Sequence, residues 1–272
     1  GGIHVRRVFS LGSRWPRLNA LLTFPAFFSP IWLLEIRAAI SQINPDLVII
    51  RDLPIALACI PFARRRKIPL VLDMAECYPE MLRCAWRFEG FRLANVLVRN
   101  PWLADRIERI AMRNLDMVWV MIGESAARLE AMGVPASRLR IVSNTPVEIG
   151  APPARRSGAG GGVLRVVYVG LINPSRGLRT VMEAARLLRD MGRKFEIKVA
   201  GSGKDFRHIA SMVERFGLQK EVQLLGWIDH QRLNDVFANA DVGLVPHYVC
   251  SHWNNTIPNK IFDYMNAGIP VV

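Results

Sequence analysis

Cysteine is scarce in this chain. The 272 residues include four cysteines, at positions 59, 77, 84 and 250, with no CxxC pair and no histidine at the spacing of a metal ligand. This usage argues against a disulfide framework and against a Cys/His metal centre. We therefore expect reduced thiols, no bound metal, and a cytoplasmic protein.

Long apolar runs are also missing. The longest, from Leu21 to Leu34, has 14 residues and is interrupted by Pro25 and Pro30. A membrane-spanning helix needs about 20 apolar residues, so this run is too short to be one. It predicts a core helix approached through prolines. The alternative is an interfacial segment that dips into a membrane, since Arg14, Arg17 and Arg37 flank it.

Acidic residues are few relative to basic ones: 23 Asp and Glu stand against 36 Lys and Arg, which gives a net charge of +13. Such a surplus favours an acidic partner, although it can also be composition alone. A nucleic-acid surface would interleave basic residues with exposed aromatics, and the longest basic run, Arg64–Lys67, has no such pattern. We therefore expect no nucleic-acid partner.

Short apolar runs alternate with helical patterns along the chain, which predicts an α/β fold with parallel sheets flanked by helices. The segment 151–162, APPARRSGAGGG, has no periodicity and is typical of a linker. We predict two Rossmann-like domains, residues 1–150 and 163–272, that face a cleft. Because the chain opens on Gly1 and stops in an apolar run at Val272, we expect both domains to be incomplete.

The predicted elements follow from periodicity and from turn residues. Strands are expected at 5–11, 46–50, 70–73, 117–122, 139–142, 164–170, 195–201, 222–225, 242–246 and 269–272. Helices are expected at 32–43, 54–66, 92–113, 125–132, 178–191, 205–216, 232–239 and 258–267.

The first candidate binding loop begins at Gly170, where a predicted strand ends. Glycine lets the backbone turn closely there, and Asn173 or Ser175 is expected to cap the next helix. A helix N-terminus attracts phosphate, and Arg176 in its first turn would add two hydrogen-bond donors. The loop therefore predicts a diphosphate site; the alternative is an exposed arginine without a ligand.

A second glycine-rich loop, Gly201-Ser202-Gly203-Lys204, follows the next predicted strand. Phe206 stands where the third glycine of a dinucleotide fingerprint would be, so a nicotinamide cofactor is not expected. We predict instead that the loop brings backbone amides and Lys204 near phosphates.

The third candidate is the segment from His247 to Gly268, whose helix is expected to begin at Pro258. Asp263 falls among apolar residues of that helix, and a carboxylate there needs a partner. A ribose would suit it, because a carboxylate accepts hydrogen bonds from two hydroxyls. The alternative partner is Lys260, one turn earlier.

The order of these motifs resembles the donor-binding domain of glycosyltransferase family 4, which has the GT-B fold. The resemblance covers essentially all of residues 163–272 and rests on VVYVGLINPSRGLRTVMEAARLL, AGSGKD, VQLLGWIDHQRLNDVFANADVGLVPH and NTIPNKIFDYMNAGIPVV. The first half resembles the family's acceptor-side domain more loosely, through PDLVIIRDLP, IPLVLDMAECYPE and GVPASRLRIVSNTPV.

The resemblance implies a set of donor-binding residues. The family's glycine-rich loop falls on Gly170 and its diphosphate-binding cation on Arg176, whereas Leu171 stands where a second cation is common. Its pair of glutamates falls on Asn255 and Asp263, of which only the second is acidic. The other positions of the predicted donor site are Gly201, Lys204, Trp227, Ile228, Ile257, Pro258 and Lys260.

The function implied by the resemblance is transfer of a sugar, with retention at the anomeric carbon, from a UDP- or GDP-linked donor. The acceptor would be a hydroxyl of a glycan or of a lipid-linked glycan, and no metal or cofactor would be needed. Arg176 would stabilise the charge of the leaving diphosphate. Asp73 and Glu76 are the candidates to orient the acceptor hydroxyl, with capping of the next helix as the alternative for Asp73.

A lipid-linked acceptor predicts peripheral binding to the anionic inner face of the plasma membrane, through Arg14, Arg17 and Arg64–Lys67. A nucleotide-sugar epimerase of the same two-domain fold is the alternative function, because His247 and His252 could act on the sugar. The run that contains Asp263 favours the transferase.

Overall fold

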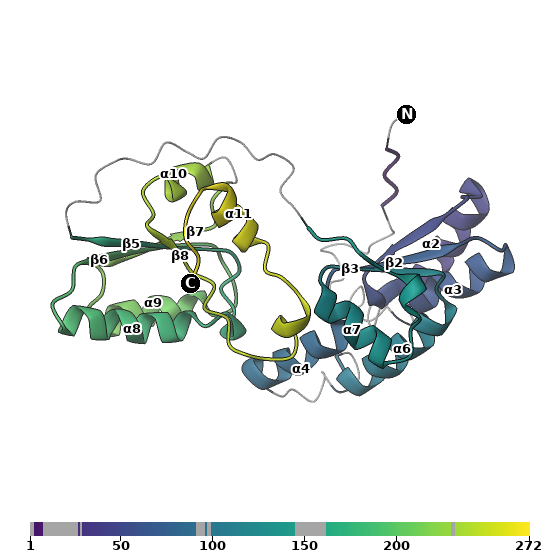
Figure 1. Cartoon of the computed structure of the whole chain (residues 1–272), viewed down its shortest axis with the longest axis horizontal. Coiled ribbons are helices and arrows are strands. Elements are labelled where there is room, and N and C mark those ends of the chain that lie inside the picture. Colours follow the sequence, from purple (N-terminus) through teal and green to yellow (C-terminus); the bar gives the residue numbers. More distant parts are fainter. Residues whose placement is uncertain are drawn as a thin grey trace. The chain divides into compact units, whose positions relative to one another are not determined.

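A computed structural model describes the chain at residues 3–7, 27, 29–90, 96, 99–144, 162–229 and 232–272. It divides into two compact units (Figure 1). The first is Gly1–Ser143 with Asn254–Thr256, and the second is Asn144–Trp253 with Ile257–Val272. Each unit contains a parallel four-stranded sheet, which confirms the predicted fold class of two Rossmann-like α/β domains.

Some predictions lie outside the described residues. These are Arg14, Arg17, residues 21–26 and 28 of the apolar run that starts at Leu21, and all but the last residue of the linker 151–162. Of the strand expected at 5–11, only residues 5–7 are described, and they form no strand.

The first unit has its strands in the order β1-β2-β3-β4. The strands are β1 (Val48–Arg51), β2 (Leu70–Met74), β3 (Met117–Val120) and β4 (Leu139–Ile141). The helices are α2 (Pro30–Ile43), α3 (Ala56–Arg65), α4 (Tyr78–Glu89), α6 (Pro101–Asn114) and α7 (Gly123–Ala131), with short 3₁₀ turns at Leu53–Ile55 and Ala136–Arg138. Alternate residues of β2, such as Leu70 and Leu72, are fully buried in the core that these helices cover.

Helix α2 shows how local signals set its ends. The Ser29 hydroxyl accepts a hydrogen bond from the Trp32 backbone at 3.3 Å, and Pro30 occupies the first helical position. Asn44 ends the helix in the left-handed conformation that asparagine tolerates. Helix α4 was not predicted. The helix predicted at 92–113 is interrupted at Arg99 and Asn100, and α6 begins after them at Pro101; of the described residues before the interruption, Val96 is helical.

The second unit has the strand order β7-β6-β5-β8. The strands are β5 (Leu164–Val169), β6 (Phe195–Ala200), β7 (Val222–Gly226) and β8 (Val242–Gly243), and the helices are α8 (Leu178–Asp190), α9 (Phe206–Arg215), α10 (Leu233–Phe237) and α11 (Lys260–Asn266). In Figure 1, α8 and α9 cover one face of this sheet and α10 and α11 the other. Successive residues of β5 serve the two cores, with Tyr168 packed in one and Val167 in the other.

The prediction of a strand at 269–272 is wrong. That segment makes one isolated bridge, between Val271 and Gly243, instead of a strand. The expected caps on the first loop are also wrong, because a 3₁₀ turn, Pro174–Arg176, separates the loop from α8, which begins after Gly177.

The strand order reverses at β5. The chain proceeds from β5 to β6 and β7 on one side, and then adds β8 on the other side of β5. The helices that follow β5 and β8 therefore leave toward opposite faces. Open α/β sheets bind ligands at such a point, beyond the carboxyl ends of the two strands.

Candidate functional site

Arg176 lies at this switch point, in the 3₁₀ turn between β5 and α8. Its Nη1 donates a hydrogen bond to Nε2 of His247, beyond β8, at 3.2 Å. Its guanidinium lies 4.3 Å from the centroid of the Trp253 ring, and the rings of His247 and His252 lie at the same distance from Trp253. His247 and Trp253 thus hold the guanidinium at the carboxyl end of the sheet, and His252 packs against Trp253.

His247 can accept this hydrogen bond because it is neutral. Burial, together with the positive charges of Lys260 and Arg176, lowers the pKa of His247 to about 3. The imidazole therefore supplies an acceptor at neutral pH, and it adds no third positive charge to the site.

The loops after β5 and β8 are packed backbone to backbone. Gly177 adopts φ +74°, and a Cβ atom there would overlap the carbonyl oxygen of Pro246. The Tyr248 amide donates to the Ser175 carbonyl oxygen at 3.2 Å. Glycine at 177 is thus required by this close approach as well as by its conformation.

Lys260 begins α11 and points its ammonium under the loop at Gly170. The side chain is 7% exposed, and Nζ lies 3.8 Å from the centroid of the Tyr168 ring. A Cβ atom at Gly170 would be 3.3 Å from Nζ, so the glycine leaves room for the ammonium. Within the described part of the chain, Nζ makes no hydrogen bond.

Electrostatics at Lys260 follow from this burial. Desolvation and the charge of Arg176 lower the pKa of Lys260 to about 7, and the attraction of Asp263 only partly opposes them. Lys260, the alternative partner predicted for Asp263, is not hydrogen-bonded to it, since Nζ makes no hydrogen bond within the described residues. Asp263 is half-buried on α11, near enough to act on Lys260 electrostatically.

The second glycine-rich loop packs directly on the first. A Cβ atom at Gly201 or Gly203 would overlap the backbone of the first loop, at Gly170 and Ile172 respectively. The Lys204 amide donates to Oδ1 of Asn173 at 3.2 Å, which is the role that Asn173 has instead of helix capping. These glycines serve contact between the two loops, and phosphate binding by Gly201 and Lys204 stays a prediction.

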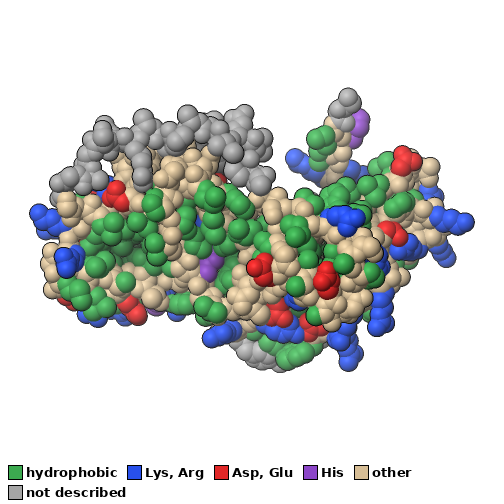
Figure 2. Space-filling model, in the orientation of Figure 1, with side chains coloured by type: hydrophobic (Ala, Val, Ile, Leu, Met, Phe, Trp, Pro, Cys, Tyr) green, Lys and Arg blue, Asp and Glu red, His purple; other side chains and the backbone are tan. Residues whose placement is uncertain are grey.

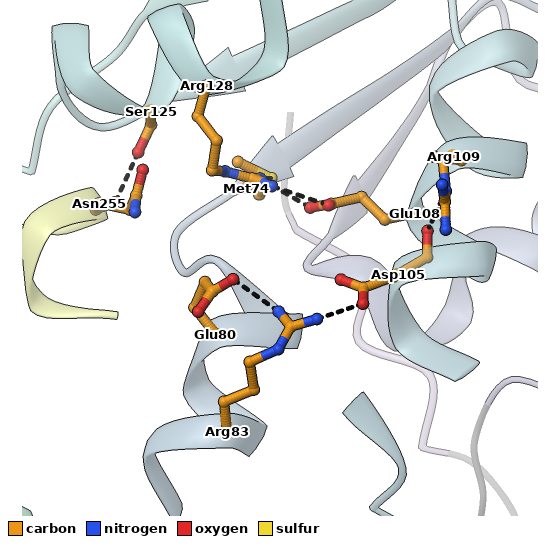
Figure 3. A network of polar contacts seen from close by, with 9 residues as sticks. All are labelled: Met74, Glu80, Arg83, Asp105, Glu108, Arg109, Ser125, Arg128 and Asn255. Carbon is orange, nitrogen blue, oxygen red and sulfur yellow. Dashed lines mark hydrogen bonds and ion pairs between the residues drawn. The ribbon is translucent and has the colours of Figure 1, made fainter. Parts of the chain in front are cut away.

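The remaining predicted donor residues fall in two places. Trp227 and Ile228 follow β7 at the carboxyl edge of the same sheet, and the Trp227 side chain is 72% exposed. Ile257 and Pro258 lead into α11. Asn255 belongs to the first unit instead, where its carbonyl oxygen accepts a hydrogen bond from the Ser125 hydroxyl at 2.5 Å (Figure 3).

Three carboxylates lie at the carboxyl ends of β1 and β2 in the first unit: Asp73 within the end of β2, Asp52 directly after β1, and Glu76 two residues after β2. Asp73 forms an ion pair with Arg51, and the N-cap residue of α4 is Cys77, which makes no side-chain cap, so the capping alternative for Asp73 is wrong. Glu76 lies between β2 and α4. Asp52, which sequence reasoning missed, has a positive φ of 61° with ψ 164° and accepts a hydrogen bond from the Ala75 amide at 3.1 Å.

Asp52 and Asp73 differ in their surroundings. Burial raises the pKa of Asp52, against the opposing charge of Arg51. A sequence signal for Asp52 existed, since it stands two residues after the strand predicted at 46–50 and two residues before Pro54. Asp52 lies one residue beyond the register of Asp73, which pairs with Arg51 across β1 and β2.

A polar network fixes the helices behind these strand ends (Figure 3). Arg128 on α7 donates to both carboxylate oxygens of Glu108 on α6, at 2.8 and 2.9 Å, and Glu108 is 1% exposed. Arg83 on α4 pairs with Glu80 and with Asp105 on α6. The network connects α4, α6 and α7.

Neither a metal cluster nor a membrane span stands out in the described ranges. No three His, Cys, Asp or Glu side chains there are placed to share a metal ion. No helix among those residues combines the length and the apolar character that crossing a bilayer requires. On the face drawn in Figure 2, Lys and Arg side chains are scattered among Asp and Glu instead of forming one basic patch.

Comparison with known families settles the relationship. A model of the family described as "Glycosyl transferases group 1" matches residues 164–272, and one described as "Glycosyl transferase 4-like domain" matches residues 1–145, more than half of the chain. The chain belongs to glycosyltransferase family 4. This confirms the resemblance inferred from the motifs.

Among curated relatives of this glycosyltransferase is the putative colanic acid biosynthesis glycosyltransferase WcaL of Escherichia coli, 28% identical over 68% of this chain and 45% of WcaL. The amylovoran biosynthesis glycosyltransferase AmsK of Erwinia amylovora is 26% identical over 53% of this chain and 36% of AmsK. The chain thus spans about half or less of the length of these relatives.

Solved structures confirm the two-domain GT-B fold. A sucrose-phosphate synthase from Thermosynechococcus elongatus matches with a TM-score of 0.69 at 16% identity, over 94% of this chain and 61% of that one. Anabaena HepE, solved in complex with UDP, matches with a TM-score of 0.63 at 16% identity, over 89% of this chain and 62% of that one.

Proposed function

We propose that this glycosyltransferase transfers a sugar from a nucleotide diphosphate donor to a hydroxyl of a glycan or lipid-linked acceptor, with retention at the anomeric carbon. The observation that carries the proposal is the position of Arg176. It stands at the switch point between β5 and β8, held there by His247 and Trp253. A cation fixed at that edge suits the diphosphate of a nucleotide sugar.

The chemistry follows from where charge develops. As the bond between the sugar and the diphosphate breaks, the leaving diphosphate gains negative charge. A guanidinium that is already oriented stabilises that charge without reorganising in the transition state. The stack on Trp253 and the hydrogen bond to His247 provide this orientation.

The donor is proposed to be UDP- or GDP-linked. HepE, which shares the fold, has been solved with UDP and with UDP-glucose, which favours a uridine donor as the first to test. Asp263 on α11 is proposed to accept hydrogen bonds from the ribose, and Trp227 with Ile228 to lie against the base. Because cationic side chains can neutralise the diphosphate, we propose that the reaction needs no divalent metal and no cofactor.

The acceptor hydroxyl is proposed to be oriented from the first unit by Asp73 and Glu76. Asp73 is paired with Arg51, which fixes the position of its carboxylate as a hydrogen-bond acceptor. The relatives WcaL and AmsK are named for colanic acid and amylovoran biosynthesis, which favours a polysaccharide or its lipid-linked precursor as acceptor. The epimerase alternative is not favoured, since these relatives are glycosyltransferases.

A lipid-linked acceptor would place the enzyme at the cytoplasmic face of an anionic membrane. Trp102 on α6 supports this: it is 62% exposed, its ring lies 5.5 Å from that of Trp86, and it lines a shallow apolar pocket with Leu103 and Arg106. Indole rings beside basic residues favour the membrane interface. The run Arg64–Lys67 supports it less than the sequence suggested, because Arg64 pairs with Asp116 and Arg66 donates to the Ile40 carbonyl.

Two experiments test the proposal. Thermal unfolding with UDP, GDP and ADP should show a higher midpoint for one of them, because a ligand that binds only the folded state stabilises it. Equal midpoints with all three and with buffer would refute donor binding. For the membrane, co-sedimentation with anionic and neutral vesicles at low and high salt should show salt-sensitive binding to anionic vesicles only, and no binding at low salt would remove that part of the proposal.

A further inference from the structure

Lys260 is a buried cation without an anionic partner in hydrogen-bond range. Its Nζ makes no hydrogen bond in the described part of the chain. The residue is 7% exposed. A buried ammonium is costly unless it is paired and hydrogen-bonded. Its one close contact, the face of Tyr168, attracts a cation weakly and accepts no conventional hydrogen bond.

The ammonium is placed where a ligand at the first loop would reach it. It lies below Gly170. Because glycine has no Cβ atom, no side chain occupies the space next to Nζ at this position. Arg176, six residues along the same loop, acts on it as the nearest repelling charge. Leu171, the residue after the glycine, carries no charge and is 56% exposed, so it neutralises nothing there.

Two cations that repel each other in a buried site are stabilised together by a ligand with two adjacent negative groups. We propose that Lys260 is the second diphosphate-binding cation of this enzyme, reaching the loop from α11 and doing from there what the uncharged Leu171 cannot. This inference rests on the proposed function, since it takes the nucleotide diphosphate as the ligand. Arg176, in the turn after β5, and Lys260, on α11, then bind the same diphosphate.

The charged and titratable groups around Lys260 come from three elements. Arg176 lies on the loop after β5, His247 follows β8, and Asp263 lies on α11. Tyr168 of β5 stays neutral, because burial raises its pKa. With a pKa of about 7, Lys260 is largely neutral at pH 8 in the free protein, and a bound diphosphate would restore its proton.

The decisive experiment is calorimetry of UDP and GDP, each beside its nucleoside, with the wild-type chain, Lys260→Met and the control Lys198→Met. Methionine keeps the unbranched stem and removes the charge, and Lys198 is a lysine of the same sheet, on β6. We expect Lys260→Met to lower the affinity for whichever nucleoside diphosphate the wild type binds by about 10- to 100-fold, the scale of a charge-assisted hydrogen bond. The affinity of Lys260→Met for the nucleoside should stay unchanged, and Lys198→Met should bind both ligands as the wild type does.

Proton uptake gives a second readout that needs no variant. Titrations at pH 8 in two buffers of different ionisation enthalpy should show that the wild-type protein takes up a proton on binding the diphosphate and none on binding the nucleoside. Diphosphate affinity unchanged in Lys260→Met, or equal losses for nucleotide and nucleoside, would each overturn the inference while leaving donor binding intact. If the wild-type chain binds neither UDP nor GDP, the proposed function fails with it.

Discussion

The hydroxyl of Tyr264 lies 3.0 Å from the backbone nitrogen of Val169 and accepts its hydrogen bond, so α11 is attached to the last residue of β5. The same hydroxyl lies 3.3 Å from the carbonyl oxygen of Leu244, which follows β8. Gly243 makes room for the ring, since a Cβ atom there would lie 2.6 Å from it. One buried side chain thus fixes α11, and with it Lys260 and Asp263, to both strands at the switch point.

Tyr264→Phe should therefore destabilise the second unit. The ring still fits, but the half-buried Val169 amide loses its acceptor. A fully buried unsatisfied donor costs about 1–3 kcal/mol, and we expect a loss toward the lower end of that range. Urea denaturation measures this difference. Tyr248→Phe is the matched control, because its hydroxyl contacts Thr180 on the exposed surface, and the two variants should differ clearly. Equal midpoints would show that the hydroxyl of Tyr264 contributes no stability.

Arg176→Ala should weaken nucleoside-diphosphate binding by about 1.5–3 kcal/mol and leave the fold intact, because it removes a charge-assisted hydrogen bond to the phosphates. Calorimetry with UDP or GDP decides it. Arg186→Ala on α8 is the control, since its ion pair with Asp190 is on the surface. Affinity equal to that of the control would remove Arg176 from the phosphate site.

Much of the fold could be predicted because periodicity reports burial. Helix α8 was expected at 178–191 and spans Leu178–Asp190, and its apolar positions Leu178, Met182 and Ala185 are the buried ones. Helix α4 was missed because its buried residues include Pro79 and Cys84, which are not typical of an apolar helix face. Charged residues lie between them, so no regular apolar pattern stands out in the sequence.

The site was harder to predict because its contacts are long-range. Arg176 could be found from its place after a strand and a glycine. Its contacts with His247 and Trp253 join residues more than 70 positions apart, in a segment without periodicity. The available signal was the concentration of His and Trp in HYVCSHWNN, between a strand and a helix. For Lys260, the sequence suggested a pairing with Asp263 one turn later, and only the structure shows that its ammonium lies under Gly170.

Asp263→Asn tests the ribose contact. The amide keeps the size of the side chain but has one acceptor oxygen, so binding of the ribonucleotide should fall, and binding of its 2′-deoxy analogue should fall less. Competition calorimetry with both nucleotides measures the two losses. If both nucleotides lose affinity equally, Asp263 acts through the charge of Lys260 and not through the ribose.

The buried pair of Glu108 and Arg128 should be costly to break and cheaper to replace. Glu108→Gln or Arg128→Met leaves one partner charged and poorly compensated, which costs about 3–5 kcal/mol for a fully buried pair and less here, because the Arg128 side chain is 21% exposed. The double variant removes both charges and should recover part of the loss. Denaturation of the four proteins forms a double-mutant cycle, and additive effects would show that the two side chains are not coupled.

The titration of Lys260 makes the stability of the ligand-free protein depend on pH in a defined direction. Its pKa is about 7 in the folded chain and about 10.4 in an unfolded one, so between these values the unfolded chain binds more protons. The free energy of unfolding should then rise with pH from 7 toward 10, by up to about 1.4 kcal/mol per pH unit, and should fall back as the pH drops toward 7.

Lys260→Met has no such group, so its stability should rise less steeply across pH 7–9.5 than that of the wild type, while Lys198→Met should follow the wild type. Urea denaturation at four pH values without nucleotide measures the slopes. Since Arg176, His247 and Asp263 remain in all three proteins, parallel curves for Lys260→Met and the wild type would mean that Lys260 keeps an ordinary pKa, and that its ammonium is better hydrated than its burial indicates.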